Sequence, residues 1–372
     1  MKVALVAESF LPRINGVTNS VLRSAEYLER QGHKAVVIAP GLAGPSQIGN
    51  VPIVRVPSVA VPGIPDVDVA RVSVRKLVKC FLELKPDVIH LASPFVLGDR
   101  AGKAAQLLGI PVVAIYQTDV IGFANHYGFG SMEALVQKWT ARVHQRADLN
   151  LAPSSAASKQ LQDLGVLNVQ HWGRGVDLEQ FNPKRRSEKL HNFWSEKNKV
   201  VVGYVGRLAP EKQILDLKQV ISDQIQLVVI GDGPQRSELK QELTGAIFTG
   251  SLSGADLGEA IASLDLLVAP GELETFCQVI QEAMASGVPV VAPNIGGPID
   301  LIKHGQTGFL YQAKNLSEMQ KYVNNLSDNQ ATRNMLGQNA RNDVANRSWD
   351  NICAQLVNHY RSVLRTTEIK AA

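Results

Sequence analysis

Short apolar runs alternate with segments of helical spacing along most of this 372-residue chain. That alternation is typical of a parallel β-sheet with helices on both faces. It occurs in two series, separated by a polar and highly charged stretch at residues 183–199. The expected strands are 3–7, 35–39, 88–91, 111–116 and 149–152 in the first series, and 200–205, 227–230, 247–249, 266–269 and 288–292 in the second. The sequence therefore predicts an α/β protein with two Rossmann-like domains.

The length of the chain also favours two domains, because single hydrophobic cores stop growing at roughly 250–300 residues. We place an N-terminal domain at residues 1–185 and a C-terminal domain at 186–350, with 183–199 as the candidate linker. Helical spacing from 316 to 364 is interrupted near Asp328 and Trp349. We therefore expect a separate last helix at 351–372.

The composition is that of an ordinary globular protein, with 45% hydrophobic and 19% charged residues. Cys80, Cys277 and Cys353 lack the spacing of metal ligands, so neither a zinc site nor a disulfide framework is expected. No apolar run approaches the roughly 20 residues that span a bilayer, and the chain opens on a strand instead of a signal peptide. These features predict a cytoplasmic protein.

Basic residues outnumber acidic ones in residues 1–185 but not in the rest of the chain. Four of them crowd residues 69–84, where the apolar positions predict a helix with one basic face; they are Arg71, Arg75, Lys76 and Lys79. An apolar loop at 59–64 comes shortly before them. Cations beside apolar residues suit contact with an anionic membrane surface, and the alternative is an ordinary solvated helix face.

Glu274 and Glu282 stand at the start of a segment that we expect to be helical, after the strand at 266–269. Positions eight apart lie within roughly 80° of each other on a helix of about 3.6 residues per turn, so both carboxylates can face one site. Carboxylates accept hydrogen bonds from sugar hydroxyls, and the backbone N–H groups of Phe276 and Cys277 at the helix head can hold a diphosphate. In the alternative, Glu274 only favours a helix N-terminus and Glu282 is solvated.

This segment resembles the E-x7-E signature of the retaining glycosyltransferases of family 4, whose GT-B fold consists of two facing Rossmann-like domains. Residues 1–19 look like the opening strand and glycine loop of that family, 174–177 like its interdomain segment and 203–212 like its phosphate-binding element. The resemblance covers nearly the full length. It implies that the last helix returns to the N-terminal domain.

The resemblance also implies roles for individual residues. Arg207 and Lys212 match the diphosphate-binding pair of the family, Glu282 would bind the ribose and Glu274 the hexose. Gly16 lacks a side chain, which lets the backbone approach a phosphate closely. Gly231-Asp232-Gly233-Pro234 lacks the third glycine of a G-x-G-x-x-G dinucleotide fingerprint, so a dehydrogenase is not expected. Gly231 and Gly233 would instead shape the loop around the nucleotide.

Gln117 occupies the place where many family members have a histidine that meets the donor sugar. Glutamine donates and accepts hydrogen bonds but carries no transferable proton, so acid or base catalysis at this position is doubtful. The resemblance implies that the departing phosphate takes the proton of the acceptor, so this replacement is tolerable. We expect a core or surface role for His126, which is near in sequence.

Asp66 and Asp68 invite a metal-site interpretation, because D-x-D triads hold divalent ions in another glycosyltransferase fold. We reject it because the preceding apolar loop offers no further hard oxygen ligands. Arg207 and Lys212 would neutralise the diphosphate in place of a metal. We therefore expect no cofactor besides the nucleotide-sugar donor.

Among family 4 enzymes, the motifs look most like the actinobacterial GDP-mannose-dependent α-mannosyltransferases of glycolipid and lipomannan assembly. This similarity implies a donor of GDP-mannose and a lipid-linked acceptor of the glycolipid or phosphatidylinositol mannoside type. It also implies peripheral association with the inner face of the cell membrane, and no nucleic-acid partner. A UDP-sugar-dependent enzyme of the same fold, a nucleotide-sugar epimerase and an inactive sugar-nucleotide sensor are the alternatives.

Overall fold

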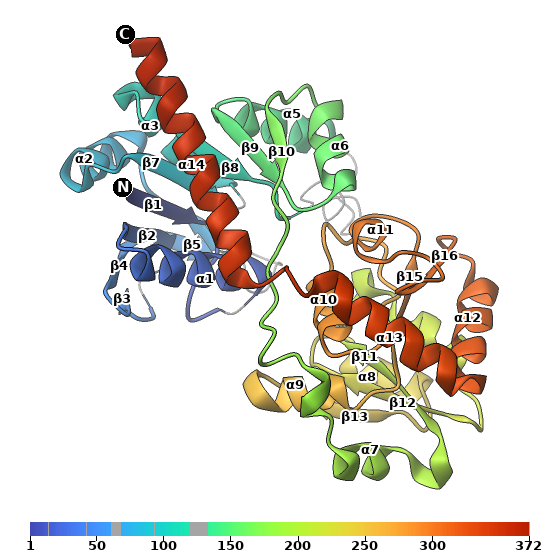
Figure 1. Cartoon of the computed structure of the whole chain (residues 1–372). Coiled ribbons are helices and arrows are strands. Elements are labelled where there is room, and N and C mark those ends of the chain that lie inside the picture. Colours follow the sequence, from blue (N-terminus) through green and yellow to red (C-terminus); the bar gives the residue numbers. More distant parts are fainter. Residues whose placement is uncertain (14, 42, 61–67, 93, 119–132, 372) are drawn as a thin grey trace. The chain divides into compact units, whose positions relative to one another are not determined.

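The computed structural model describes residues 1–13, 15–41, 43–60, 68–92, 94–118 and 133–371. The chain divides into two compact units (Figure 1). Unit 1 comprises Met1–Arg174 with Trp349–Ala372, and unit 2 comprises Gly175–Ser348. The first boundary precedes residue 185, the limit that the sequence suggested, because Val176 and Phe181 belong to the hydrophobic core of unit 2.

Unit 1 is built on an eight-stranded sheet in the order β10-β9-β8-β7-β1-β2-β4-β3. Its pairings are parallel except the one between β3 and β4. Its strands are β1 (Lys2–Ala7), β2 (Lys34–Pro40), β3 (Gln47–Ile48), β4 (Val51–Val56), β7 (Val88–Ala92), β8 (Val112–Ile115), β9 (Leu149–Ala152) and β10 (Val169–His171). A separate antiparallel pair joins β5 (Ser58–Ala60) and β6 (Asp68–Ala70). The central strands are runs of buried Val, Ile, Leu and Ala, as expected of parallel strands that are covered on both faces.

Hydrophobic clusters lie on both faces of this sheet. Among the described residues of the unit, the helices are α1 (Gly16–Arg30), α2 (Val74–Leu84), α3 (Val96–Leu108), α5 (Glu133–His144), α6 (Ser155–Asp163) and α14 (Trp349–Ala371). Side chains of α1 and α14 meet the sheet in one cluster, and those of α2 and α3 meet it in another. Parallel strands with helices on both faces match the Rossmann-like architecture that the sequence predicts.

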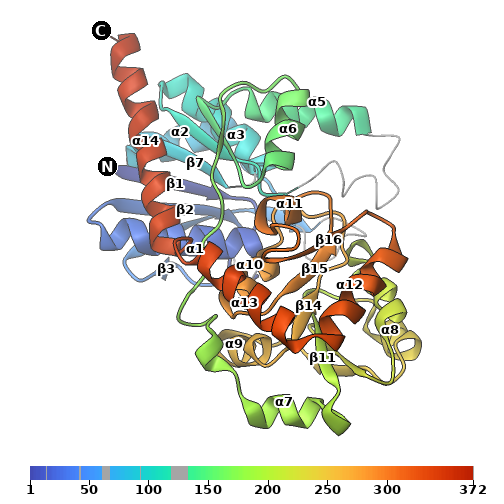
Figure 2. The same cartoon turned by 45° about the vertical axis from the view of Figure 1, so that its right-hand side comes forward.

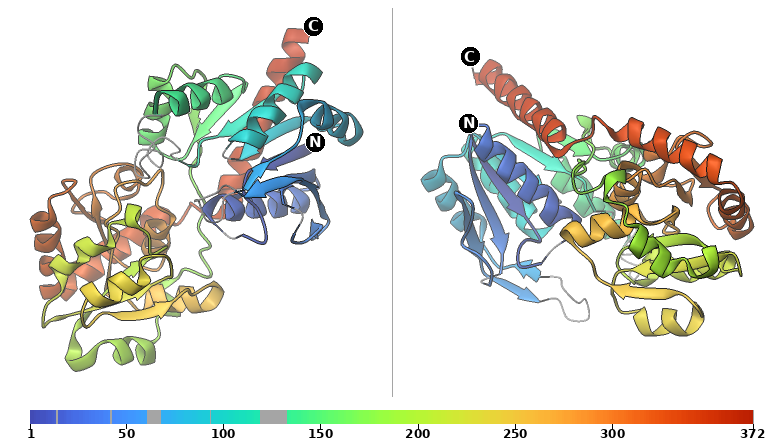
Figure 3. Two further views of the ribbon diagram at one scale, coloured as in Figure 1. Left: turned by 180° about the vertical axis from the view of Figure 1, so that it is seen from behind. Right: turned by 60° about the horizontal axis from the view of Figure 1, so that its bottom comes forward.

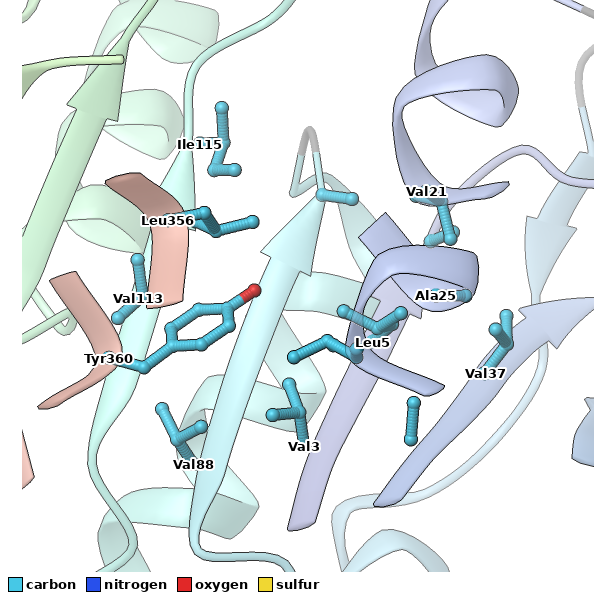
Figure 4. Packing of buried hydrophobic residues seen from close by; sticks show 14 of the residues in the cluster. Val3, Leu5, Val21, Ala25, Val37, Val88, Val113, Ile115, Leu356 and Tyr360 are labelled. Atoms are coloured by element: carbon cyan, nitrogen blue, oxygen red, sulfur yellow. The ribbon is translucent and has the colours of Figure 1, made fainter. Parts of the chain in front are cut away.

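The last helix, α14, belongs to unit 1, which confirms the expected return of the chain to the N-terminal domain. Tyr360 of α14 is buried among Val88, Val113 and Leu356 (Figure 4). Its hydroxyl lies 2.5 Å from Nδ1 of His90 on β7. Burial lowers the pKa of His90 to about 3, so the imidazole stays neutral and the hydrogen bond does not change with pH near neutrality.

Unit 2 has a six-stranded sheet in the order β13-β12-β11-β14-β15-β16. Figure 2 labels β11, β14, β15 and β16 of this sheet. Its strands are all parallel: β11 (Val200–Val205), β12 (Ile225–Ile230), β13 (Ile247–Gly250), β14 (Leu266–Val268), β15 (Val290–Pro293) and β16 (Gly308–Tyr311). The strand order reverses between β11 and β14. Open α/β sheets bind ligands beyond the carboxyl ends of the strands at such a switch point.

Helices cover both faces of this second sheet (Figure 3). They are α7 (Glu188–Trp194), α8 (Arg236–Glu242), α9 (Gly254–Ala262), α10 (Gln278–Ala285), α11 (Pro298–Leu301), α12 (Leu316–Asp328) and α13 (Gln330–Val344), with 3-10 turns η2 (Pro183–Arg185), η3 (Glu196–Asn198), η4 (Pro210–Lys212) and η5 (Ile214–Val220). The candidate linker at 183–199 is therefore wrong, because the whole segment belongs to unit 2. It contains α7, whose Trp194 is buried in the core of unit 2.

Within the described residues, no helix combines the length and the hydrophobicity that crossing a bilayer requires.

Candidate functional site

The loops that follow β11 and β12 approach each other so closely that only glycine fits between them. A Cβ atom on Gly231 would lie 1.9 Å from the carbonyl oxygen of Gly206, and one on Gly233 would lie 2.4 Å from that of Leu208. The N–H of Leu208 donates to the carbonyl of Asp232 at 2.9 Å. These contacts hold Arg207 at the carboxyl end of β11. They give the two glycines a packing role, while their part in nucleotide binding stays a prediction.

Lys212 and Glu274 meet at the switch point of the sheet. Lys212 ends η4 after β11, and Glu274 lies in the loop after β14. The Nζ of Lys212 is 2.5 Å from Oε1 of Glu274. Burial opposes the charge of Lys212, but the neighbouring carboxylate outweighs it and raises the pKa of the lysine above its ordinary value. The structure thus brings together two of the residues that the sequence assigned to the donor site, and keeps the lysine charged.

Arg207 points toward solvent from the same loop, with 53% of its side chain exposed. Its guanidinium forms an ion pair with Glu211, whose carboxylate side chain is 0% exposed. A buried carboxylate can hold one edge of a guanidinium while the other N–H groups remain available to a ligand. Glu211 is therefore a positioning residue that the sequence analysis did not single out, and its signal was the spacing of four residues from Arg207.

The relation between Glu274 and Glu282 differs from the one that the sequence predicted. Helix α10 begins at Gln278, so Glu282 lies on the helix but Glu274 lies in the preceding loop. The predicted placement of both carboxylates on one helix is therefore wrong. The carbonyl of Glu274 accepts a hydrogen bond from the N–H of Gly297 at 2.7 Å, which ties this loop to the one after β15.

Gly296 and Gly297 support this loop and were missed in the sequence. A Cβ on Gly296 would lie 2.6 Å from the carbonyl oxygen of Glu274, and one on Gly297 would lie 2.4 Å from Cα of Phe276. The available signal was a glycine pair that begins four residues after the predicted strand at 288–292. Like Gly231 and Gly233, the pair lets two strand-end loops pack against each other by their backbones.

Phe276 and Cys277 are buried at the start of α10. Cys277 is the N-cap residue and has a positive φ of 68°. The first N–H groups of any helix have no partner within it, so this end of α10 can receive an anion. Burial raises the pKa of the Cys277 thiol well above its ordinary value, so the thiol stays protonated near neutral pH. The assignment of Phe276, Cys277 and Glu282 to the donor stays a prediction.

In unit 1, Gly16 is the first residue of α1 and lies against the buried guanidinium of Arg174. Asn15 caps the helix by accepting a hydrogen bond from the N–H of Thr18 at 2.9 Å. Arg174 donates to the carbonyl of Gly16, and a Cβ on Gly16 would lie 3.4 Å from its Nη atoms. The missing side chain of Gly16 thus leaves room for the guanidinium of Arg174 at the start of α1. The sequence analysis named Arg174 only as part of a segment.

Glu8, directly after β1, is a second residue of unit 1 that the sequence analysis did not select. Its Oε1 accepts hydrogen bonds from the N–H groups of Phe95 and Gly98, both at 2.7 Å, at the head of α3. Burial raises the pKa of this carboxyl to about 7, although the two hydrogen bonds oppose the shift. The available signal was an acidic residue at the carboxyl end of the first strand.

Gln117 follows β8 and is buried, with 6% of its surface exposed. Its role toward the donor sugar stays a prediction. His126 and Asp66 lie outside the described residues. Asp68 forms an ion pair with Arg13 at 3.2 Å. Among the described residues there is no group of three side chains suited to hold a metal ion, and a metal-independent reaction likewise stays a prediction.

The basic face of unit 1 is also shorter than predicted. Helix α2 begins at Val74, capped by Ser73, so Arg71 lies before the helix. Arg71, Arg75, Lys76 and Lys79 are all exposed. Leu77 and Phe81 are buried on the opposite face, and Leu82 is 58% exposed. We call the four cations with Leu82 the α2 surface.

Comparisons with known proteins agree with this architecture. Residues 14–180 match the model described as Glycosyltransferase Family 4, and residues 186–343 match the one described as Glycosyl transferases group 1. The chain is 45% identical to a GDP-mannose-dependent alpha-mannosyltransferase of Mycolicibacterium smegmatis, with 100% of both chains covered. It is 44% identical to an enzyme of the same name from Corynebacterium glutamicum, with 99% of this chain and 90% of the other covered.

A solved structure with a similar fold is Anabaena HepE in complex with UDP, with a TM-score of 0.77, 21% identity and coverage of 97% of this chain and 100% of the other. Sucrose-phosphate synthase of Thermosynechococcus elongatus has a TM-score of 0.78 at 19% identity, with 98% of this chain and 99% of the other covered. The predicted GT-B fold is confirmed by these structures and by the two Rossmann-like units. The chain belongs to the glycosyltransferases of family 4.

Proposed function

We propose that this enzyme transfers mannose from GDP-mannose to a lipid-linked acceptor, with retention of the anomeric configuration, at the inner face of the cell membrane. The observation that carries the proposal is the Lys212–Glu274 pair beside Arg207 at the switch point of unit 2. The full-length similarity to enzymes named GDP-mannose-dependent alpha-mannosyltransferases supports the choice of donor. The acceptor class rests on the resemblance of the motifs.

The two cations would act on the leaving group. As the bond between the anomeric carbon and the phosphate oxygen breaks, negative charge grows on the diphosphate. Arg207 supplies a forked guanidinium and Lys212 a compact ammonium where this charge develops. Glu274 holds Lys212 in place through one oxygen. We propose that its other carboxylate oxygen accepts a hydrogen bond from a hydroxyl of the hexose.

The proton of the acceptor would leave without a protein base. The acceptor oxygen bonds to the anomeric carbon on the face from which the phosphate departs, and its proton passes to an oxygen of that phosphate. Departure and attack on one face retain the configuration. Gln117 fits this route because its amide can hold a sugar hydroxyl but carries no transferable proton.

Donor choice is tested by calorimetric titration of the enzyme with GDP, UDP and ADP. We expect GDP to bind at least tenfold more tightly than UDP or ADP. Tighter binding of UDP would replace GDP-mannose with a UDP-sugar in the proposal. Incubation with GDP-mannose alone should leave the sugar unchanged, because a transferase does not epimerise its donor. An epimerised nucleotide sugar would instead identify an epimerase.

Transfer should persist in excess EDTA, because Arg207 and Lys212 supply the charge that a divalent cation provides in metal-dependent enzymes. The measurement is the initial rate with GDP-mannose before and after dialysis against the chelator. A loss of activity that magnesium or manganese restores would revive the metal site at Asp66 and Asp68.

Replacing the four cations of the α2 surface by Gln should weaken binding to anionic vesicles, because each cation near such a surface contributes about 1 kcal/mol. The measurement is sedimentation with phosphatidylserine-containing vesicles at low and high salt. A matched control removes four other exposed cations of unit 1, namely Lys34, Lys138, Lys159 and Arg365.

The control should retain most vesicle binding, and both variants should keep the affinity for GDP. Equal losses in both variants would mean that net charge alone governs binding. Unchanged binding by the α2 variant would make the α2 surface an ordinary solvated helix face.

A further inference from the structure

A cavity of about 570 Å³ opens at the carboxyl ends of β15 and β16 in unit 2. This volume falls within the range of roughly 300–1,000 Å³ that small-molecule sites occupy. The cavity is lined by residues of the loops after both strands, of β16 and the segment before it, and of α12. None of the residues assigned to the donor is among those that line it.

The polar side chains of this cavity are held in place by the protein itself. Glu318 accepts hydrogen bonds from the N–H of Gln312 at 2.6 Å and from the hydroxyl of Tyr322 at 3.0 Å. The Gln312 N–H bond holds the pKa of Glu318 below its usual range, so the carboxylate is charged near neutral pH. Asn315 accepts a hydrogen bond from the N–H of Glu318 at 3.1 Å. These groups need little ordering when a ligand binds, which favours affinity.

The same contacts determine which hydrogen bonds remain for a ligand. Nδ1 of His304 accepts a hydrogen bond from the N–H of Leu310, with 3.1 Å between the two nitrogens. In the neutral imidazole the proton must then be on Nε2, which is a donor. The amide nitrogen of Asn315 is a second donor, and the phenol oxygen of Tyr322, whose hydrogen is given to Glu318, is an acceptor. Mixed donors and acceptors suit hydroxyl groups, which are both.

An aromatic cluster adjoins these polar groups. The rings of Phe309 and Tyr322 are stacked with centroids 4.7 Å apart, and His304 meets each of them edge to face at 5.5 Å. A sugar ring has apolar C–H faces and a rim of hydroxyls, so it matches a surface where aromatic rings lie beside hydrogen-bonding groups. The described residues that line the cavity include neither Lys nor Arg. A phosphate group would meet the Glu318 carboxylate within this lining, and the nearby Lys321 is not itself a lining residue.

We propose that this cavity is a second carbohydrate site, which binds a hexose unit of a neutral glycan independently of the nucleotide-sugar donor. Asn294 and Gln312 extend the polar lining at its two strand ends. The site would retain a mannosylated acceptor or product through a sugar other than the reacting one. The choice of a mannosylated ligand rests on the proposed function, whereas binding at the cavity does not depend on which nucleotide the donor carries.

The test uses soluble α-mannotriose as the probe and saturation-transfer NMR with the full-length enzyme. We expect binding that persists in saturating GDP. The double variant Asn294→Ala/His304→Ala should bind mannotriose at least tenfold more weakly. Both residues line the cavity, are exposed and carry hydrogen-bonding groups that alanine lacks. The control is Gln320→Ala, an exposed substitution on α12 outside the cavity, which should leave binding unchanged.

The affinity for GDP shows whether a variant that loses mannotriose binding is still folded. We expect this affinity to be the same in the wild type and in all variants. Loss of mannotriose binding on addition of GDP would overturn the proposal, because the sugar would then occupy the donor site. Equal mannotriose binding by the wild type and the double variant would also overturn it, as would the absence of binding to the wild type. A failure of donor assignment appears instead as weak GDP binding with mannotriose binding intact.

Discussion

Replacing Lys212 by Ala should lower the turnover number about a hundredfold or more, and Arg207→Ala should have an effect of similar size. Removing one preorganised group that stabilises charge in the transition state commonly costs about 2.7 to 4 kcal/mol. Lys212 is ion-paired, partly buried and kept charged by Glu274, so its charge is fixed before the donor binds. The measurement is the steady-state rate with GDP-mannose at saturating acceptor.

The matched control for both variants is Lys218→Ala, which removes an exposed lysine of the same unit that pairs with Glu242. This control should stay within twofold of the wild type. Lys212→Ala also leaves the Glu274 carboxylate without its partner, so thermal unfolding must be measured alongside. A folded Lys212→Ala variant with activity within a few-fold of the wild type would contradict the diphosphate assignment.

Gly233→Ala should destabilise unit 2 by about 3 kcal/mol or more and abolish GDP binding. The added Cβ would lie 2.4 Å from a carbonyl oxygen and 2.7 Å from the N of Leu208, and backbone atoms cannot turn aside as a flexible side chain can. The loops after β11 and β12 would have to separate to relieve these close contacts. The free-energy cost of that separation lies at the upper end of the range that is usual for overpacking. That separation would displace Arg207. The measurement is chemical unfolding followed by GDP titration.

Gly245→Ala provides the comparison, because that glycine has a positive φ of 83° but no atom within 4 Å of the position that a Cβ would take. It should cost only the backbone strain of about 1–2 kcal/mol. Equal stability of the two variants would mean that the loops tolerate a wider spacing. The packing role of Gly233 would then be wrong.

The regular parts of the fold could be predicted because they depend on local pattern. Buried strands such as β1 and β11 are continuous apolar runs, and their alternation with helices indicates the parallel sheets. The segment at 183–199 was misjudged because its helix α7 is short and anchored mainly by one aromatic residue, Trp194. The other residues of this segment are mostly polar, so its composition did not indicate that Trp194 is buried in the core.

The candidate site was predictable in its residue types but less so in its geometry. Lys212 and Glu274 lie 62 positions apart in sequence, and only the strand order places them together. The start of α10 was misjudged because the residues before it have no regular structure that a period could reveal. Contacts such as the one between Arg174 and Gly16 span 158 positions, so no local pattern could predict them.

The central claim is tested most directly by incubating the enzyme with GDP-mannose, radiolabelled in the sugar, and a membrane lipid extract. The account predicts a labelled glycolipid whose label α-mannosidase releases, formed by the wild type and reduced about a hundredfold by Lys212→Ala. Absence of labelled lipid from GDP-mannose, with labelling from a UDP-sugar under the same conditions, would contradict it.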